Sequence, residues 1–214
     1  MSAKGTSESP AQGKKIGTSP ALEGDFNRDG KPDIAVTSDI SNTVSVLLGN
    51  GSGGFNPPTS VAVGQLPGNL ISADLNGDNI LDLVTANALV SASNVSVLLG
   101  NGTGGFGSAT NFAAGNAPRS LATGDFNGDG KPDLLVGNSP AKVSVLISDG
   151  AGSFAVPVNV SVGNNPLSIG VGDFNNDGKL DFVTANGADN NVSILLGKGQ
   201  EVSPRARPAR ISAC

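Results

Sequence analysis

This sequence of 214 residues contains no histidine, tryptophan or tyrosine, and its single cysteine, Cys214, is the last residue. The usual nucleophile–base pairs of covalent catalysis are therefore absent, and no intrachain disulfide can form. A zinc site is disfavoured for the same reason, because its usual ligands are His and Cys. No apolar run approaches the roughly 18 residues of a membrane helix, and residues 1–24 lack the apolar stretch of a signal peptide.

The negative charge of the chain is concentrated in a few places. The formal net charge is −5, and twelve of the fifteen aspartates lie in four short segments. The remainder of the chain is therefore net positive, so the acidity is local and does not form a solvating coat. This distribution argues against nucleic acid as a partner, since such a partner requires a basic surface.

The four aspartate-rich segments are copies of one nine-residue pattern. They begin 49, 51 and 48 residues apart, and they read DFNRDGKPD from Asp25, DLNGDNILD from Asp74, DFNGDGKPD from Asp125 and DFNNDGKLD from Asp173. Each copy is followed by a short apolar run and then by a second run that begins at Val44, Val95, Val143 or Val192. In three copies a glycine-rich stretch with one phenylalanine comes next, namely GNGSGGF, GNGTGGF or SDGAGSF.

Short runs of aliphatic and β-branched residues between Gly, Asn and Pro are typical of strands, and no segment shows a helical period. Each copy thus holds about four short strands in roughly 50 residues. The middle runs are apolar at successive positions, so each sheet needs cover on both faces. We predict an all-β fold, a β-propeller or partial propeller of about four four-stranded blades. A β-sandwich is the alternative, although it explains the even repeat less well.

Oxygen-bearing side chains stand at positions 1, 3, 5 and 9 of each segment, and in the third copy these are Asp125, Asn127, Asp129 and Asp133. Three carboxylates held close together repel one another unless a cation lies among them. Hard cations such as Ca²⁺ take six to eight oxygen ligands, and the carbonyl at position 7 can add one. Glycine at position 6 permits a sharp turn, and Asn79, which replaces it in the second copy, tolerates the same left-handed backbone.

Two other interpretations of the segment are weaker. An EF-hand loop shares the first six positions but needs a glutamate at position 12 and flanking helices. Position 12 is here Val36, Thr85, Val136 or Thr184, and the flanks are predicted strands. Asp, Asn and Gly are also ordinary turn residues, but four copies with oxygen ligands at the same four positions make that explanation alone insufficient.

The loop DFNGDGKPDLLV together with VSVLLGNGTGGF resembles the FG-GAP/VCBS repeat, the calcium-binding blade of propellers such as integrin α-chain heads. The resemblance covers roughly residues 16–197 and implies that the loop joins the first two strands of a blade and binds Ca²⁺, up to four ions per chain, with Mg²⁺ or Mn²⁺ as substitutes. Carried over by position, the implied side-chain ligands are Asp25, Asn27, Asp29 and Asp33; Asp74, Asn76, Asp78 and Asp82; Asp125, Asn127, Asp129 and Asp133; and Asp173, Asn175, Asp177 and Asp181, joined by the position-7 carbonyls of Lys31, Ile80, Lys131 and Lys179.

The repeat divides the chain into a flexible segment at 1–15, a four-repeat propeller domain at 16–197 and a divergent tail at 198–214. The tail shows no clear strand. Either the chain is a fragment of a longer array, or residues around 11–17 supply the outer strand of the last blade and close a four-bladed ring. Pairing of two chains is a further way to complete a ring.

Two functions agree with these observations. The first is a calcium-stabilised module for protein interaction or surface adhesion, in an extracellular or periplasmic setting that the resemblance implies. Its ligand would be a protein or a glycan, but the aromatic content of 4%, all phenylalanine, disfavours a lectin. The second is a metal-dependent hydrolase of phosphoesters or phosphotriesters, in which metal-bound water at the loops is the nucleophile.

Overall fold

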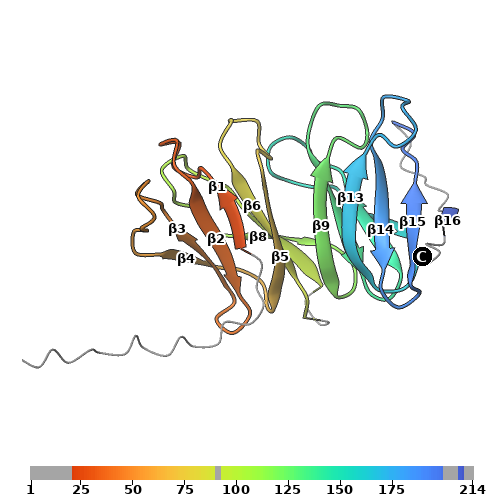
Figure 1. The fold of residues 1–214 in the computed structure, drawn as a ribbon, viewed down its shortest axis with the longest axis horizontal. Coiled ribbons are helices and arrows are strands. Elements are labelled where there is room, and N and C mark those ends of the chain that lie inside the picture. The colour runs from red at the N-terminus through yellow and green to blue at the C-terminus, as the bar shows by residue number, and fades with distance from the viewer. Residues whose placement is uncertain (1–20, 90–92, 200–206, 210–214) are drawn as a thin grey trace, which may run out of the picture.

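The aspartate-rich segments and the apolar runs behind them form four antiparallel sheets of four strands each (Figure 1). The structure is a computed structural model and describes residues 21–89, 93–199 and 207–209. We call the sheets blades 1 to 4 in chain order. Within each blade the strands pair in sequence order, as predicted for propeller blades, and two large sheets of a sandwich are not formed.

The strands have the following bounds. Blade 1 comprises β1 (Ala21–Gly24), β2 (Asp33–Ser38), β3 (Thr43–Leu47) and β4 (Thr59–Ala62). Blade 2 comprises β5 (Pro67–Ala73), β6 (Asp82–Asn87), β7 (Asn94–Leu98) and β8 (Thr110–Ala113). Blade 3 comprises β9 (Pro118–Gly124), β10 (Asp133–Asn138), β11 (Lys142–Leu146) and β12 (Val158–Ser161). Blade 4 comprises β13 (Pro166–Gly172), β14 (Asp181–Asn186), β15 (Asn191–Leu195) and β16 (Arg207–Ala209).

The last strand corrects one expectation from the sequence. Residues 198–214 show no clear strand by composition, yet β16 pairs antiparallel with β15, with Val192 opposite Ala209 and Ile194 opposite Arg207. The exposed edge of β15 offers unpaired backbone groups, and an edge strand accepts a proline such as Pro208. In the described chain β16 therefore takes the outer position of blade 4. Residues 11–17, the other candidate for that position, lie outside the described residues.

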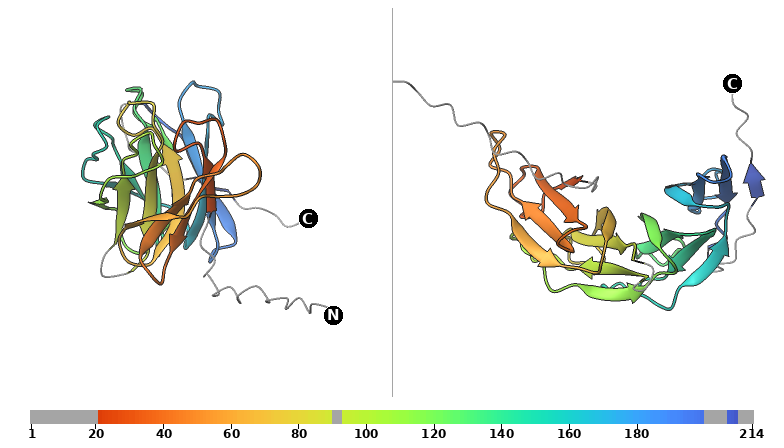
Figure 2. Two further views of the ribbon diagram at one scale, coloured as in Figure 1. Left: turned by 90° about the vertical axis from the view of Figure 1, so that its left-hand side faces the viewer. Right: turned by 90° about the horizontal axis from the view of Figure 1, so that it is seen from below.

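The blades stand side by side in an open arc, seen from below in the right-hand view of Figure 2. The first strands of consecutive blades, β1, β5, β9 and β13, contact one another along the inside of the arc. Strands β6 and β10 of the two middle blades are buried along their whole length, because a neighbouring blade covers each face. Strand β14 of the last blade is partly exposed, since no blade follows it in the described chain.

We call the packing between consecutive blades a junction, and the first two junctions are built alike. At the first, the ring of Phe26 at loop position 2 of blade 1 packs edge-on against Phe106 of blade 2, with ring centroids 5.7 Å apart. The Gly104 N–H of blade 2 donates to the Phe26 carbonyl over 3.1 Å. The Leu48 side chain of blade 1 lies directly over Gly104, so a Cβ there would meet its Cδ2 atom at 2.6 Å.

The second junction repeats these contacts one blade further along. The Gly152 N–H of blade 3 donates to the carbonyl of Leu75, the position-2 residue of blade 2, over 3.2 Å. Leu99 lies over Gly152 as Leu48 lies over Gly104, and here a Cβ would meet its Cδ2 atom at 2.9 Å. Each junction also encloses an apolar cluster drawn from both blades. A blade therefore depends on its neighbours for most of its apolar burial.

A matched pair of glycine substitutions tests the first junction. Gly104 and Gly130 both have φ +83°, but a Cβ on Gly130 would have no atom within 4 Å. Alanine at either position brings backbone strain of about 1–2 kcal/mol, and only Gly104→Ala must also displace Leu48, for about 1–3 kcal/mol more. We expect urea denaturation in EDTA to show the larger loss for Gly104→Ala, and equal losses would contradict the close packing.

Candidate metal-binding loops

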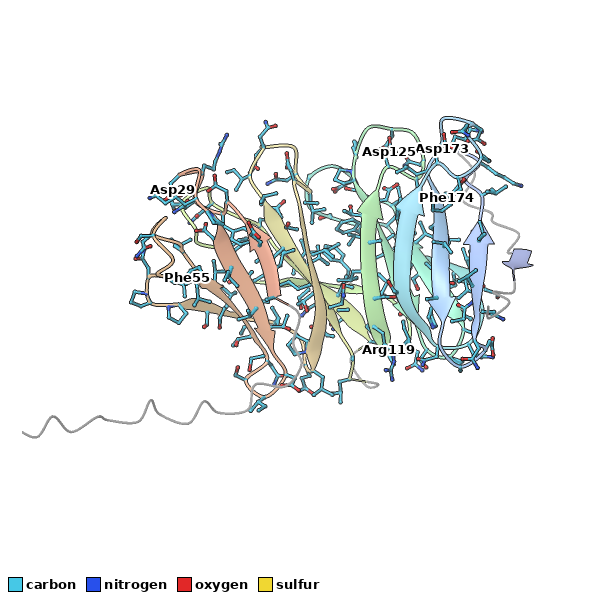
Figure 3. The ribbon with its side chains drawn as sticks, viewed as in Figure 1. Asp29, Phe55, Arg119, Asp125, Asp173 and Phe174 are labelled. Carbon is cyan, nitrogen blue, oxygen red and sulfur yellow. The ribbon has the colours of Figure 1, made fainter. Side chains whose placement is uncertain are left out.

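The four nine-residue loops occupy equivalent places in the fold. Each joins the first and second strands of its blade, as predicted, and all four lie along one edge of the arc (Figure 3). In that view Asp29, Asp125 and Asp173 mark the loops at the upper edge, whereas Arg119 lies at the opposite edge. The propeller geometry therefore gathers the acidic segments, which are about 50 residues apart in sequence, onto one surface.

The side chains at positions 1 and 3 converge in every loop. The backbone N–H of position 5 is shared by the carboxylate of position 1 and the amide oxygen of position 3. In the third loop the Asp129 N–H donates to Asp125 over 3.1 Å and to Asn127 over 2.8 Å. The other three loops repeat this arrangement with distances of 2.9–3.1 Å. Two predicted ligand oxygens therefore lie close together in each loop, as a shared cation would require.

The second carboxylate oxygen of position 1 accepts the N–H of position 6, for example from Gly130 over 2.8 Å. Position 6 has positive φ in all four loops, including Asn79 at 62°, so asparagine does take the left-handed backbone expected of it. The sequence interpretation missed that position 4 also has positive φ, with Arg28 at 61° and Asn176 at 58°. The signal available was the preference for Gly and Asn at position 4 in three of the copies.

Position 9 is the buried member of each loop. Its aspartate is 0% exposed in all four copies and accepts two backbone N–H groups from different parts of the blade. One oxygen accepts the N–H of loop position 2, and the other accepts the N–H of the second residue after the third strand, with N–O distances of 2.7–3.0 Å in all four blades. The aspartates at position 9 are Asp33, Asp82, Asp133 and Asp181. Both oxygens keep a second lone pair for a further partner.

The surroundings of the loop aspartates shift the pKa values of some of them. Burial raises the pKa of Asp82, and the nearby carboxylates of Asp78 and Asp74 raise it further, although its two backbone N–H partners act in the opposite direction. Asp133 has a raised pKa for the same reasons. In the first loop the Lys31 ammonium lies 3.0 Å from Asp29 and lowers the pKa of that exposed carboxyl.

The loop lysines do not share one role. Lys131 occupies the same position as Lys31, but its Nζ donates to the Asp149 carbonyl over 2.9 Å. Of the two, only Lys31 forms a side-chain bond to its own loop aspartate. These are local contacts of exposed residues in a turn.

The donor set of each loop suits a hard divalent cation, because it offers carboxylate, amide and carbonyl oxygens and no nitrogen or sulfur. Among residues 21–89, 93–199 and 207–209, no three His, Cys, Asp or Glu side chains converge as a metal site. The carboxylate of position 5 accepts the position-7 N–H, and that of position 9 accepts its two backbone partners. The residues thus fit calcium by chemistry, and their assignment as ligands stays a prediction.

Asparagines outside the acidic loops also have structural roles. The Asn50 and Asn101 side chains each accept two backbone N–H groups inside the glycine-rich stretch, over 2.9–3.1 Å, and so hold that turn. Asn87 donates to Ser96 over 2.8 Å, and Ser96 donates to Asn111 over 2.6 Å, which links three strands of blade 2. The bonds of Asn87 and Asn111 depend on pairing across strands, so spacing along the chain could not have revealed them.

Four-stranded antiparallel blades around an arc, each with the same acidic loop between its first two strands, define a protein of the β-propeller class. The profile of the FG-GAP-like repeat family matches residues 25–85, 74–136 and 125–184 in three consecutive copies. The chain therefore belongs to the FG-GAP-like repeat family, which confirms the resemblance given by its sequence. Among curated proteins, no sequence matches this chain.

Solved structures share the fold at low sequence identity. The crystal structure of BBS1N in complex with ARL6DN, soaked with lead, has a TM-score of 0.62 at 12% identity and covers 90% of this chain and 56% of that chain. A lectin of Agrocybe aegerita that recognises non-reducing terminal N-acetylglucosamine has a TM-score of 0.57 at 22% identity; the match covers 86% of this chain and 50% of the lectin chain. This chain thus spans about half the length of either structure.

The two kinds of loop aspartate can be separated by substitution. In EDTA, Asp133→Asn places an amide NH₂ against a backbone N–H donor and leaves that donor unsatisfied, for a loss of about 1–3 kcal/mol. Asp129→Asn keeps an oxygen for its one backbone partner and removes one of three like charges, so we expect a change within about 0.5 kcal/mol. Thermal or urea unfolding measures both changes. An Asp133→Asn variant as stable as the unsubstituted chain would contradict the structural role of position 9.

The raised pKa of Asp82 and Asp133 predicts a pH dependence of the metal-free chain. An acid whose pKa is higher in the folded state binds its proton more tightly there. The contribution of these two groups to stability should therefore grow as the pH falls from their folded pKa towards the usual value of 3.8, and this contribution should be lost as the pH rises through the folded pKa. Carboxyl ¹³C titration in EDTA tests this, and pKa values at or below 3.8 for both groups would contradict it.

Proposed function

We propose that this chain is a calcium-binding interaction module, in which ions in the acidic loops stiffen propeller blades that present a surface to a macromolecular partner. The observation that supports it most is the recurrence of one loop geometry in all four blades. In each loop the oxygens of positions 1 and 3 meet at a single N–H group. Turn formation alone does not require three aspartates at constant positions in every copy.

The proposed ligands are the side-chain oxygens of positions 1, 3, 5 and 9, with the carbonyl of position 7. Each loop carries three carboxylates; burial raises the pKa of Asp82 and Asp133, and the neighbouring carboxylates raise it further. A divalent cation would remove this repulsion, whereas the single ammonium of Lys31 reaches only Asp29. Calcium is the natural candidate because it accepts flexible oxygen shells, and Mg²⁺ or Mn²⁺ would substitute less well or in fewer loops.

Ion binding in the loops would stabilise the whole blade. Position 9 connects the loop to the end of the third strand through its backbone bonds, for example from Asp133 to the N–H groups of Phe126 and Ser148. A ligand that binds only the folded chain adds about 2.7 kcal/mol per site at a hundredfold excess over its Kd. Four sites could therefore contribute as much as the roughly 5–15 kcal/mol stability of a typical domain.

The partner is proposed to be a protein. BBS1N, which shares the fold, was solved in complex with ARL6DN, and the Agrocybe aegerita lectin is described as recognising a sugar. A sugar site usually uses Trp or Tyr for stacking, and this chain has neither. An extracellular or periplasmic setting completes the proposal, because calcium modules with Kd values of about 10⁻⁴–10⁻³ M are saturated only where calcium is abundant.

The hydrolase alternative gains no support from the described residues. The cavity at the outer face of blade 1 has a volume of about 440 Å³ and is lined by Ala21, Leu22, Glu23, Pro32, Ile34 and Phe55. None of these six residues is a proposed ion ligand, although Pro32 lies between two of them in the first loop, so the cavity lining itself provides no metal site. The structure also contains no helix, within the ranges that it describes, of the length and apolarity needed to cross a membrane.

Calorimetric titration tests the proposal directly. We expect the chain to bind up to four Ca²⁺ ions, Asp129→Asn to lose or weaken one of them, and Asp39→Asn, whose aspartate lies outside the loops, to bind like the parent. Addition of EDTA should lower the melting temperature markedly in the parent and less in Asp129→Asn. A chain that takes up no calcium, or whose melting temperature ignores EDTA, would refute the calcium module.

A further inference from the structure

The two ends of the arc carry the two unmatched halves of a blade junction. At the first junction Phe26 is 1% exposed because blade 2 covers it. Phe174 occupies the same loop position in blade 4, yet it is 50% exposed. Leu196, which corresponds to Leu48, is 45% exposed. Blade 4 thus leaves the position-2 ring and the leucine of a junction about half exposed in the described chain, with no following blade to cover them.

The outer face of blade 1 carries the receiving half. Its cavity of about 440 Å³ is lined largely by apolar side chains, with Glu23 as the one charged member. Phe55 corresponds to Phe106, the ring that packs against Phe26 within the chain. Pro32 and Ile34 correspond to Leu81 and Leu83, which belong to the apolar cluster around Phe26.

A glycine and a serine complete the correspondence at this face. Gly53 is the counterpart of Gly104, and no atom lies within 4 Å of the place where its Cβ would stand. At the internal junction that place is filled by Leu48 of the preceding blade. Ser45 corresponds to Ser96, whose hydroxyl accepts the Gly64 N–H of the preceding blade over 3.0 Å. The Ser45 hydroxyl shares a hydrogen bond with that of Ser60 over 2.8 Å. The space over Gly53 is thus the part of this face that a preceding blade would fill.

The two halves lie at opposite ends of one open arc. Phe55 and Phe174 are labelled at the two extremes of the molecule in Figure 3. In the right-hand view of Figure 2 both ends of the arc face the same side. A second copy rotated by a half turn about the propeller axis would therefore place its Phe174 end against the Phe55 end of the first copy. The same half turn places the Phe174 end of the first copy against the Phe55 end of the second. This rotation keeps all the acidic loops on one edge.

We propose that two copies of this chain associate head to tail, with Phe174 of each seated in the cavity beside Phe55 of the other and Leu196 lying over Gly53. Each contact joins two different surfaces, the half rotation repeats it, and the two equal contacts of this two-fold dimer close a ring of eight blades. Its chemistry is that of the first internal junction, an aromatic pair and aliphatic side chains with one backbone bond from the glycine N–H. The proposed occupant of the cavity is a second copy because, among the described residues, the last blade is the one that exposes the matching half.

Light scattering and sedimentation over a concentration series, in calcium throughout, test the pairing. We expect the parent to form a dimer, and Phe174→Asp or Phe55→Asp alone to weaken association by roughly tenfold or more, since each buries a charge in place of a ring. Val156→Asp is the matched control, because Val156 is 89% exposed and corresponds to no residue of either half-junction. It should associate like the parent.

Mixing the two variants gives the sharper outcome. An equimolar mixture of Phe174→Asp and Phe55→Asp retains one intact junction between the two chains, so dimer should reappear although neither variant forms it alone. If an aspartate variant shows no cooperative unfolding by circular dichroism, a second variant replaces it. Leu196→Glu replaces Phe174→Asp in blade 4, and Pro32→Glu replaces Phe55→Asp in blade 1. A parent that stays monomeric, variants that associate unchanged, or a mixture without dimer would overturn the head-to-tail pairing, and monomer would assign the cavity to another part of the chain or to another protein.

Discussion

A buried aspartate at loop position 9 is the interaction on which each blade depends. Its two oxygens accept one N–H from the start of its own loop and one from beyond the third strand. One side chain therefore connects the first turn of the blade with the end of its third strand. A buried carboxylate is unfavourable unless its oxygens are satisfied, so the surrounding backbone must keep this arrangement. The same arrangement holds in all four blades, with the aspartate fully buried in each.

This constraint explains why the acidic loops have a regular shape before any ion is considered. The carboxylate of position 1 and the amide oxygen of position 3 accept backbone N–H groups within the loop. The aspartate of position 9 accepts the N–H of position 2 and so joins the two ends of the loop. Each loop therefore combines three negative charges with a firmly built frame. The proposed calcium ion would use oxygens that the frame already holds near one another, which reduces the entropy lost on binding.

The junctions explain the exposure of the blades. A glycine-rich stretch lets a leucine of the preceding blade lie directly on the backbone, and an apolar cluster fills the rest of each interface. The middle blades have such cover on both sides and are buried throughout their second strands. In the described chain the terminal blades have such cover on one side only, which leaves Phe174 and the cavity beside Phe55 open. The arrangement of the repeats, and not the composition of any one blade, decides this difference.

The sequence by itself determined the all-β class, the four blades, the place of each acidic loop between two strands and the left-handed backbone at position 6. These follow from apolar runs and turn residues, which act within a few residues of chain. Only the tertiary structure decided that position 9 reaches the N–H of Gly49, Gly100, Ser148 or Gly197, because that contact spans 15 to 18 residues. It also decided that Arg207–Ala209 forms the outer strand of blade 4, and that Phe174 is exposed where Phe26 is buried. Two residues of the same kind in the same local pattern differ here because burial depends on which blade stands beside them.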